Sequence, residues 1–242
     1  MAFYINNKEF ESQEEFSKYG RGCATKNPTP IEILRVDEEI SSNKSRRRLF
    51  SKVTVEIRFH HLTYGARGLI TKSQREKQIL LLNRAFSGAG LTFSYSESKV
   101  QFVDNYNWYK MGHGSVSERE AKTSLGVDSK RYLNFYTGGL VSGLLGWATY
   151  PFDLSGDPLL DGVVVLDESL PNGNASPYNL GMTGVHEVGH WLGLKHITGD
   201  SNCGDDNCAD TPTQGAQTGQ GTACNSPTTS CGSVDMIENY MD

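Results

Sequence analysis

The chain has 242 residues, 37% of them hydrophobic and 21% charged, which suits one sizeable domain preceded by a short accessory segment but not several domains. No uninterrupted apolar run approaches the roughly 20 residues that a membrane span requires, so we expect no such span. The net charge of -5 provides no broad basic surface for phosphate contacts, which argues against nucleic acid as a partner.

Residues 1–50 are predicted to form a separate segment ahead of a main domain at residues 51–242. The segment is polar and ends in the basic run Arg46-Arg47-Arg48. From Lys52 to His60 apolar and polar residues alternate, which is the period of a half-buried strand. Between Thr71 and Ser87 the apolar residues recur at helical spacing, which predicts a helix.

Further strands and a second helix follow in alternation. Gly162 to Leu166 is a continuous apolar run, typical of a strand that is buried on both faces. The other predicted elements are strands at Leu91 to Tyr95, Val100 to Val103 and Tyr132 to Tyr136, and a helix from about Tyr178 to Leu192. This order predicts an α/β fold with a mixed, mostly parallel, twisted sheet. After Gly193 we expect an irregular C-terminal subdomain held by cross-links or ions.

The stretch from His186 to His196 carries the pattern of a metal site. Residues four apart lie one above the other on a helix, so His186 and His190 present two imidazoles to one ion. Glu187 sits beside them, where it can polarise a metal-bound water rather than bind the metal, which is the role of a general base. Gly193 can take a positive φ, end the helix and turn the chain so that His196 reaches the same ion.

Three histidine ligands leave the fourth position of a zinc ion open. An open position for water marks a catalytic zinc, whereas structural zinc sites are closed by four protein ligands. The extended motif, followed by a methionine, is the signature of the metzincin endopeptidases. Met241 is our candidate for the methionine of the Met-turn beneath the zinc site. We therefore predict a zinc-dependent endopeptidase with a metzincin-like catalytic domain and an active-site helix.

Stretches across most of the chain resemble the pappalysin family of secreted metzincins: Arg21-Gly22-Cys23-Ala24-Thr25, Leu144-Leu145-Gly146-Trp147-Ala148, His186 to His196, Asp210-Thr211-Pro212 and Asn239-Tyr240-Met241-Asp242. The resemblance implies two subdomains around a horizontal cleft, and often bound calcium. It also implies that Gly138 to Tyr150 forms the upper edge strand of the cleft, where an extended substrate adds as a strand. Core packing of its leucines and tryptophan is an equally good interpretation. The family continues past the Met-turn, so a sequence ending at Asp242 predicts a domain truncated just after it.

Cys23 lies far from the other cysteines, ahead of the main domain. As a thiolate it could occupy the open zinc position in place of water and hold the enzyme latent. The resemblance supports such a cysteine switch, which would make residues 1–50 a pro-like segment and Arg46 to Arg48 a cleavage site for its removal. The alternatives are an unpaired surface or intermolecular cysteine and a solvated basic loop.

The other four cysteines crowd into the last fifth of the chain, in loop-like sequence: Cys203, Cys208, Cys224 and Cys231. This clustering favours disulfides, and disulfides form in oxidising compartments. We therefore expect an extracellular or periplasmic protein, although Met1 to Phe16 lacks the apolar core of a secretory signal. Three pairings are possible, of which we favour Cys203 with Cys231 and Cys208 with Cys224.

Asp205-Asp206-Asn207, with Asp210 and Thr211 behind it, offers oxygen ligands in one loop. The spacing is not that of an EF-hand loop, so the residues alone favour a solvated turn. The family resemblance raises calcium as a second ion, with Asp206 and Thr211 as the best positions.

The leading functional prediction is hydrolysis of protein or peptide substrates, with Glu187 taking a proton from a zinc-bound water and delivering it to the leaving amine. The alternative is a zinc-bearing but non-catalytic binding or inhibitory protein, motivated by the end of the sequence at Asp242. Retention of Glu187 argues against this alternative, because a pure binder needs no general base. The sequence gives no prediction of the oligomeric state.

Overall fold

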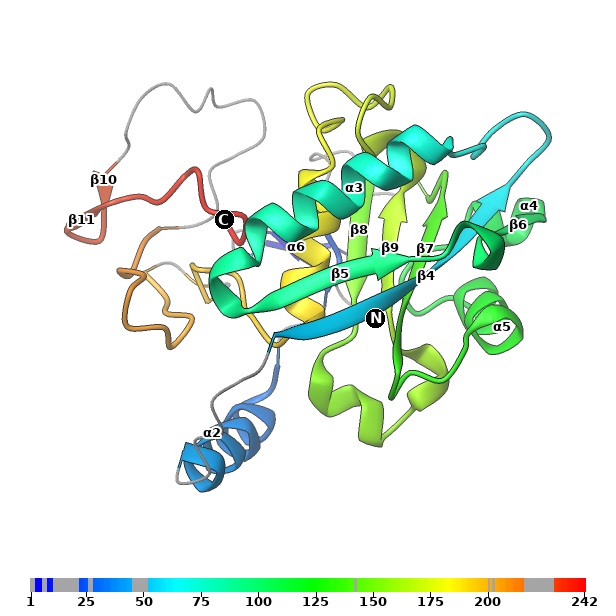
Figure 1. Ribbon diagram of the computed structural model, residues 1–242. Coiled ribbons are helices and arrows are strands. Elements are labelled where there is room, and N and C mark those ends of the chain that lie inside the picture. The colour runs from blue at the N-terminus through cyan, green and yellow to red at the C-terminus, as the bar shows by residue number, and fades with distance from the viewer. Residues whose placement is uncertain are drawn as a thin grey trace.

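A computed structural model describes residues 3–5, 8–10, 22–25, 28–44, 52–141, 143–199, 201, 203–215 and 229–242. Their centre is a seven-stranded sheet in the order β3-β8-β9-β7-β4-β5, with β6 paired to β4 beyond the end of β5 (Figure 1). Its strands are β3 (Gly22–Cys23), β4 (Val53–Thr63), β5 (Leu91–Tyr95), β6 (Gln101–Asp104), β7 (Tyr132–Gly138), β8 (Leu144–Ala148) and β9 (Val163–Leu166). Every pairing is parallel except that of β8 with β9. The predicted mixed, mostly parallel sheet is confirmed.

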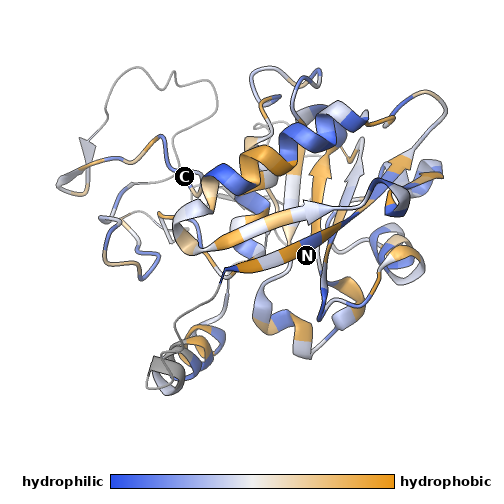
Figure 2. Cartoon of the chain, in the orientation of Figure 1, coloured by the Kyte–Doolittle hydropathy of each residue, from blue (hydrophilic) through white to orange (hydrophobic). Residues whose placement is uncertain are grey.

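Helices cover both faces of this sheet. On one face α3 (Lys72–Ala85) and α6 (Met182–Trp191) pack over a core to which β4, β7 and β9 contribute alternate residues. On the other face α4 (Tyr106–Tyr109) and α5 (Val116–Leu125) lie over the intervening residues of the same strands. The fully buried β9 is apolar over its whole length, as Figure 2 shows. Among the described residues, no helix is long and apolar enough to cross a membrane.

The remaining elements are short or lie at the ends of the chain. They are the hairpin of β1 (Phe3–Ile5) and β2 (Lys8–Phe10), helix α2 (Pro30–Lys44), the hairpin of β10 (Thr229–Ser230) and β11 (Ser233–Val234), and 3-10 turns η1 (Ser87–Ala89), η2 (Glu97–Lys99), η3 (Pro151–Ser155), η4 (Pro158–Leu160) and η5 (Asp167–Ser169).

The structure corrects several predicted boundaries and adds helices that the pattern of apolar residues missed. Strand β4 runs past His60 to Thr63, and the strand expected over Gly138 to Tyr150 is limited to β8. The active-site helix begins at Met182 rather than near Tyr178, because Gly181 before it has a left-handed φ of 82°. Helices α2 and α5 were not predicted. Both had a local signal, since Thr29 caps α2 through Glu32 and Ser115 accepts a hydrogen bond from the backbone of Glu118 in α5.

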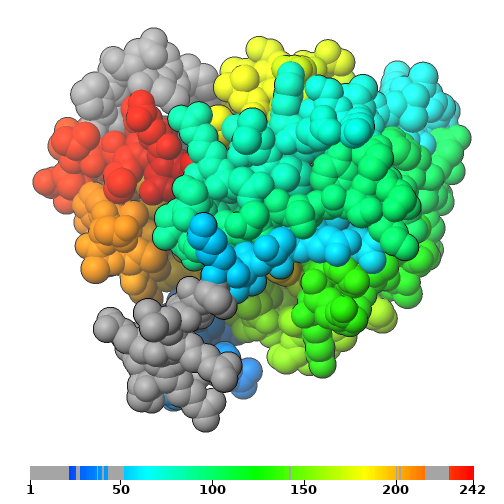
Figure 3. All heavy atoms as spheres, viewed as in Figure 1, coloured from blue at the N-terminus to red at the C-terminus, as the bar shows by residue number. Residues whose placement is uncertain are grey.

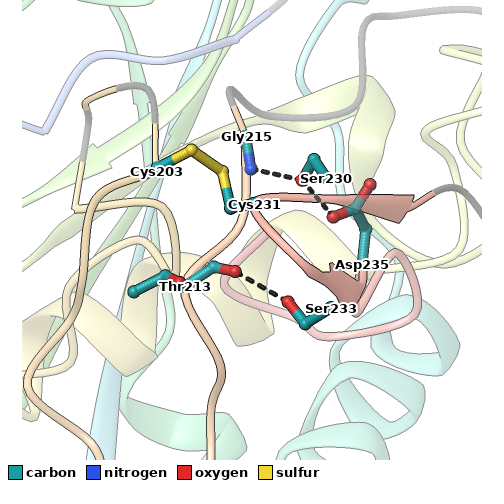
Figure 4. Close-up of a disulfide and its surroundings, with 7 residues drawn as sticks. All are labelled: Cys203, Thr213, Gly215, Ser230, Cys231, Ser233 and Asp235. Atoms are coloured by element: carbon teal, nitrogen blue, oxygen red, sulfur yellow. Dashed lines mark hydrogen bonds between the residues drawn. A yellow bond between two sulfur atoms is a disulfide. The ribbon is translucent and has the colours of Figure 1, made fainter.

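The C-terminal region after α6 has little regular structure, as predicted. In the space-filling view its residues 203–214 (orange) and its last residues (red) form one continuous surface beside α3 (Figure 3). A disulfide joins Cys203 to Cys231 across this surface. Figure 4 shows hydrogen bonds beside it, from Ser233 to the carbonyl of Thr213 and from the backbone of Gly215 to Ser230. Local turns and this cross-link therefore hold the region.

Candidate metal centre

Helix α6 and the turn behind it bring three imidazoles together. The Nε2 atoms of His186 and His190 are 3.1 Å apart, and that of His196 lies 3.1 Å from the first and 3.2 Å from the second. The two helical histidines share a face because they are four residues apart. Gly193 has a φ of 103°, which ends the helix and turns the chain toward His196.

The protons of two of these rings are fixed by backbone carbonyls. His186 donates from Nδ1 to the carbonyl of Tyr240 at 2.6 Å, and His190 donates from Nδ1 to that of Leu194 at 2.8 Å. In the neutral rings Nε2 then carries a lone pair and no proton. Burial, followed by the two neighbouring histidines, holds the pKa of His190 well below its usual value, so its ring is neutral.

The arrangement of the Nε2 atoms fits a tetrahedral zinc ion. Ligand nitrogens about 2.05 Å from zinc lie roughly 3.3 Å from one another in a tetrahedron, close to the spacing seen here. The Nε2 atom of the neutral His190 ring has no proton to donate. Its 3.1 Å separation from Nε2 of His186 is the spacing expected of two ligands that share one cation.

Met241 lies against α6, the helix that carries His186 and His190. A Cβ on Gly189 would come within 2.5 Å of the Met241 sulfur, so only glycine permits this approach of the helix to the methionine. The backbone of Ile197 donates to the carbonyl of Met241 at 2.9 Å. Met241 therefore contacts the neighbours in sequence of His190 and His196, and its role as the Met-turn residue stays a prediction.

Glu187 points to another side of α6, into a slot against strand β8. A Cβ on Gly146 would come within 2.8 Å of Glu187 Oε1 and 2.7 Å of the carbonyl of Val164, so the missing side chain makes room for the carboxyl group. Glu187 is fully buried, and this burial raises its pKa to about 8 although hydrogen bonds from Cys23 and Thr25 act in the opposite direction.

The family assignment follows from comparison with known proteins. The peptidase M43 family model, described as pregnancy-associated plasma protein-A, matches residues 118–242. An extracellular metalloprotease of Arthroderma benhamiae is 36% identical over 218 residues, which cover 87% of this chain and 77% of that protein. The chain belongs to the pappalysin family. Another extracellular metalloprotease, from Colletotrichum graminicola, is 31% identical over 91% of this pappalysin and 81% of its own length.

Solved structures agree with this assignment. A promirolysin mutant from Tannerella forsythia matches with a TM-score of 0.75 and 27% identity, covering 92% of this pappalysin and 86% of that chain. Mature mirolysin from the same organism, in complex with a cleaved peptide, matches with a TM-score of 0.65 and 28% identity. The match covers 80% of this pappalysin and 84% of that chain. The predicted metzincin fold and metalloendopeptidase class are confirmed.

Cys23 lies beside the three histidines, at the end of the short strand β3. Its sulfur and the three histidine nitrogens all lie within 4.8 Å of one another. The thiol also donates to Glu187 Oε2 at 3.5 Å. Burial, followed by the charge of Glu187, raises the pKa of the Cys23 thiol, whereas a bound cation would act in the opposite direction.

The remaining predicted residues lie elsewhere in this pappalysin. Asp206 Oδ1 accepts hydrogen bonds from Thr211 Oγ1 at 2.7 Å and from the backbone of Cys208 at 2.9 Å. Calcium at Asp206 and Thr211 stays a prediction. The Cys208 thiol is free among the described residues, while Cys224 lies outside them, as do Arg46 to Arg48.

Two residues of the site were not assigned by sequence reasoning. Thr25 is buried and contacts Glu187, and the hydroxyl of Tyr150 lies 3.3 Å from His190 Nδ1. Thr25 stands two residues after Cys23 within a stretch that already resembles the family, so its position was a usable signal. Nothing in the spacing of Tyr150 indicated its approach to the active-site helix, because the contact depends on how η3 follows β8.

Proposed function

We propose that this protein is an extracellular zinc-dependent endopeptidase that uses Glu187 as general base and is kept latent by Cys23. The observation that carries the proposal is the trio of Nε2 atoms at the spacing of zinc ligands. Zinc held there supplies Lewis-acid chemistry, which polarises the scissile carbonyl and acidifies water. The names of the relatives and the cysteine-rich C-terminal region support the extracellular location.

In this proposal Glu187 moves the proton of the reaction. Its carboxyl group lies in the slot made by Gly146, and its Oε2 is 3.5 Å from the Cys23 sulfur, which lies within 4.8 Å of the three histidine nitrogens. From there it takes a proton from the attacking water and passes it to the leaving amine. This position favours an enzyme over a non-catalytic zinc-bearing binder.

Strand β8 offers the edge on which an extended substrate would pair. In the described chain this edge is taken by the segment that contains Cys23: Gly22 donates to the carbonyl of Gly143, and Ala24 donates to that of Gly146, both at 2.9 Å. A substrate that adds to β8 must first displace residues 22–25. The segment therefore blocks the cleft while Cys23 competes for the open metal position.

The latency proposal treats residues 1–50 as a pro-like segment and residues 51–242 as the catalytic domain. The match to promirolysin covers 92% of the chain, against 80% for mature mirolysin, which supports this division. Removal by cleavage after Arg46, Arg47 or Arg48 would release Cys23 together with β3.

The test is cleavage of an unfolded protein by the zinc-loaded chain, with and without a chelator. Cleavage should stop with the chelator and return when zinc is added. Cys23→Ala should raise the initial activity of the uncleaved chain, because the metal position and the β8 edge become accessible. Equal activity of Cys23→Ala and the unmodified chain before any cleavage would show that Cys23 is not the latch.

A further inference from the structure

Thr25 contacts both the general base and the substrate-pairing strand through one hydroxyl group. Its Oγ1 lies 3.1 Å from Glu187 Oε2 and 2.9 Å from the backbone nitrogen of Ala148 on β8. The residue is only 8% exposed, so water does not compete freely for these contacts. Its backbone nitrogen donates to the Cys23 sulfur at 3.3 Å, which ties it to the latch cysteine.

The direction of both hydrogen bonds is fixed by the groups themselves. The backbone N–H of Ala148 can only donate, so Thr25 Oγ1 accepts from it. The single proton of the hydroxyl then goes to Glu187 Oε2, which makes this a hydrogen bond to an ionisable group. The other carboxyl oxygen, Oε1, is buried without a hydrogen-bond partner in the described chain, against Gly146.

The geometry points to Thr25 as a second inhibitory residue, one that acts on the general base and on the cleft strand while Cys23 acts on the metal position. This inference rests on the proposed endopeptidase and deepens its regulation. The Thr25 hydroxyl occupies both Oε2 of Glu187 and the N–H of Ala148. Attacking water and substrate backbone therefore both require Thr25 to leave.

The two inhibitory residues depend on each other through a short closed network. Thr25 donates through its backbone N–H to the Cys23 sulfur and through its hydroxyl to Glu187 Oε2, so it links the two groups. Removing the hydroxyl leaves Glu187 Oε2 with one partner fewer and a buried N–H on Ala148 unpaired. Buried polar groups left unpaired destabilise the arrangement that buries them, so the seated segment becomes less favourable relative to the displaced one.

Thr25→Val tests this, because valine keeps the branched shape and removes the hydroxyl. The full zinc-loaded chain is used, with Arg46, Arg47 and Arg48 replaced by glutamine and mass spectrometry confirming that it is intact. The readout is the rate at which a thiol reagent modifies Cys23, resolved from Cys208 by peptide mapping. We expect Thr25→Val to raise this rate about tenfold, the effect of losing a buried hydrogen bond and leaving the N–H of Ala148 unpaired.

Two control variants separate the hydroxyl from other effects. Thr25→Ser keeps the hydroxyl and should label at the rate of the unmodified chain. Thr29→Val makes the same change at an exposed position of the same segment, where the hydroxyl exchanges hydrogen bonds with Glu32, and should also leave the rate unchanged. If Thr25→Ser accelerates labelling as much as Thr25→Val, the methyl group rather than the hydroxyl holds the segment and the inference is wrong.

A double-mutant cycle tests whether the Thr25 hydroxyl acts through Glu187. In a Glu187→Ala background the acceptor is absent, so Thr25→Val should accelerate labelling at least about threefold less than it does when Glu187 is present. An undiminished effect would mean that Thr25 restrains β8 alone and not the general base, which overturns the inference as stated.

Removing residues 1–50 provides the last control, because the Thr25 variants then become the same molecule. The trimmed protein therefore reports on the catalytic domain alone, without Cys23 or Thr25. Absence of chelator-sensitive cleavage in this trimmed protein would overturn the proposed endopeptidase but leave the labelling result intact. Normal cleavage together with unchanged labelling of Thr25→Val would overturn the role of Thr25 alone.

Discussion

The part of the chain up to α6 and the region after it are built on different principles. The first part buries apolar residues on both faces of the sheet, with Leu133, Phe135 and Val163 fully enclosed. In the region after α6, the buried apolar side chains among the described residues are Ile197 and Met241, and several of its buried residues are polar. The first part is therefore held by burial and the second by hydrogen bonds, turns and the Cys203–Cys231 disulfide.

The metal centre joins these two parts. His186, His190 and Glu187 come from a helix anchored in the sheet core, whereas His196 and the carbonyl of Tyr240 come from the sparsely packed region. A metal ion bound at this point would cross-link the two parts. Such an ion would order the region after α6, which supplies the third histidine.

Metal removal should have the largest effect and should separate the two parts. We expect chelation to abolish peptide hydrolysis and to make residues 196–242 susceptible to limited proteolysis while the sheet stays protected. His190→Ala should likewise lower zinc from one equivalent per chain, because it removes one of three converging ligands. Metal analysis and mapping of cleavage sites check both. Full stoichiometric zinc in His190→Ala would refute the site.

Glu187→Ala should lower the rate of peptide hydrolysis and leave the metal-mediated cross-link between the two parts in place. We expect zinc to be retained and peptide hydrolysis to fall by a factor of about 100 to 10,000, because the general base is lost and the three ligands are not. Metal analysis beside steady-state kinetics gives the answer. Loss of zinc in this variant would mean that Glu187 is a ligand.

Glu118→Ala should destabilise the sheet part specifically. Glu118 forms a buried ion pair with Lys122 at 2.9 Å and accepts from Trp147 of β8 at 2.6 Å. Removing one partner of a buried pair costs about 3–5 kcal/mol, which denaturant unfolding of the whole chain measures. Unchanged unfolding would show that the network contributes nothing to the core.

The contacts of Glu118 with Lys122 and Trp147 should also make the stability of the sheet part depend on pH in acid. Burial alone would raise the pKa of Glu118, but Lys122, His113 and the hydrogen bond from Trp147 hold it below its usual value. The stabilisation by the ionised pair is therefore present above the pKa of the unfolded chain and is lost as the pH falls through the lowered pKa. The difference in unfolding free energy between the unmodified chain and Glu118→Ala should shrink over that range. A difference that stays constant would contradict this account.

Replacing Cys203 and Cys231 together by serine should give the smallest effect, confined to the region after α6. The bond closes a loop with a sequence separation of 28 residues. Loop closure of that size contributes about 3–4 kcal/mol in the chain-entropy model. Proteolysis of residues 203–242 should accelerate in the double variant, while the denaturant unfolding of the sheet stays the same. Faster unfolding of both parts together would show that they are one cooperative unit.

Local sequence determined the parts of the site that depend on residues close to one another along the chain. The four-residue offset of His186 and His190 is a property of any helix, and Gly193 supplies the positive φ that any return to His196 needs. Alternation and apolar runs likewise predicted β4, β5 and β9, because burial of one or both strand faces is written in the residue pattern. Helices α2 and α5 escaped because their signals lie in capping residues rather than in a strong apolar stripe.

Tertiary structure alone decided which distant residues meet. Gly146 makes the slot for Glu187 only because β8 runs antiparallel beside β9 next to α6, and no spacing in the sequence encodes that approach. The same holds for the Thr25 hydroxyl, which reaches a carboxyl group 162 residues away and a strand N–H 123 residues away. Short-range periodicity fixes the direction of side chains along one element, whereas contacts between elements depend on how the whole core packs.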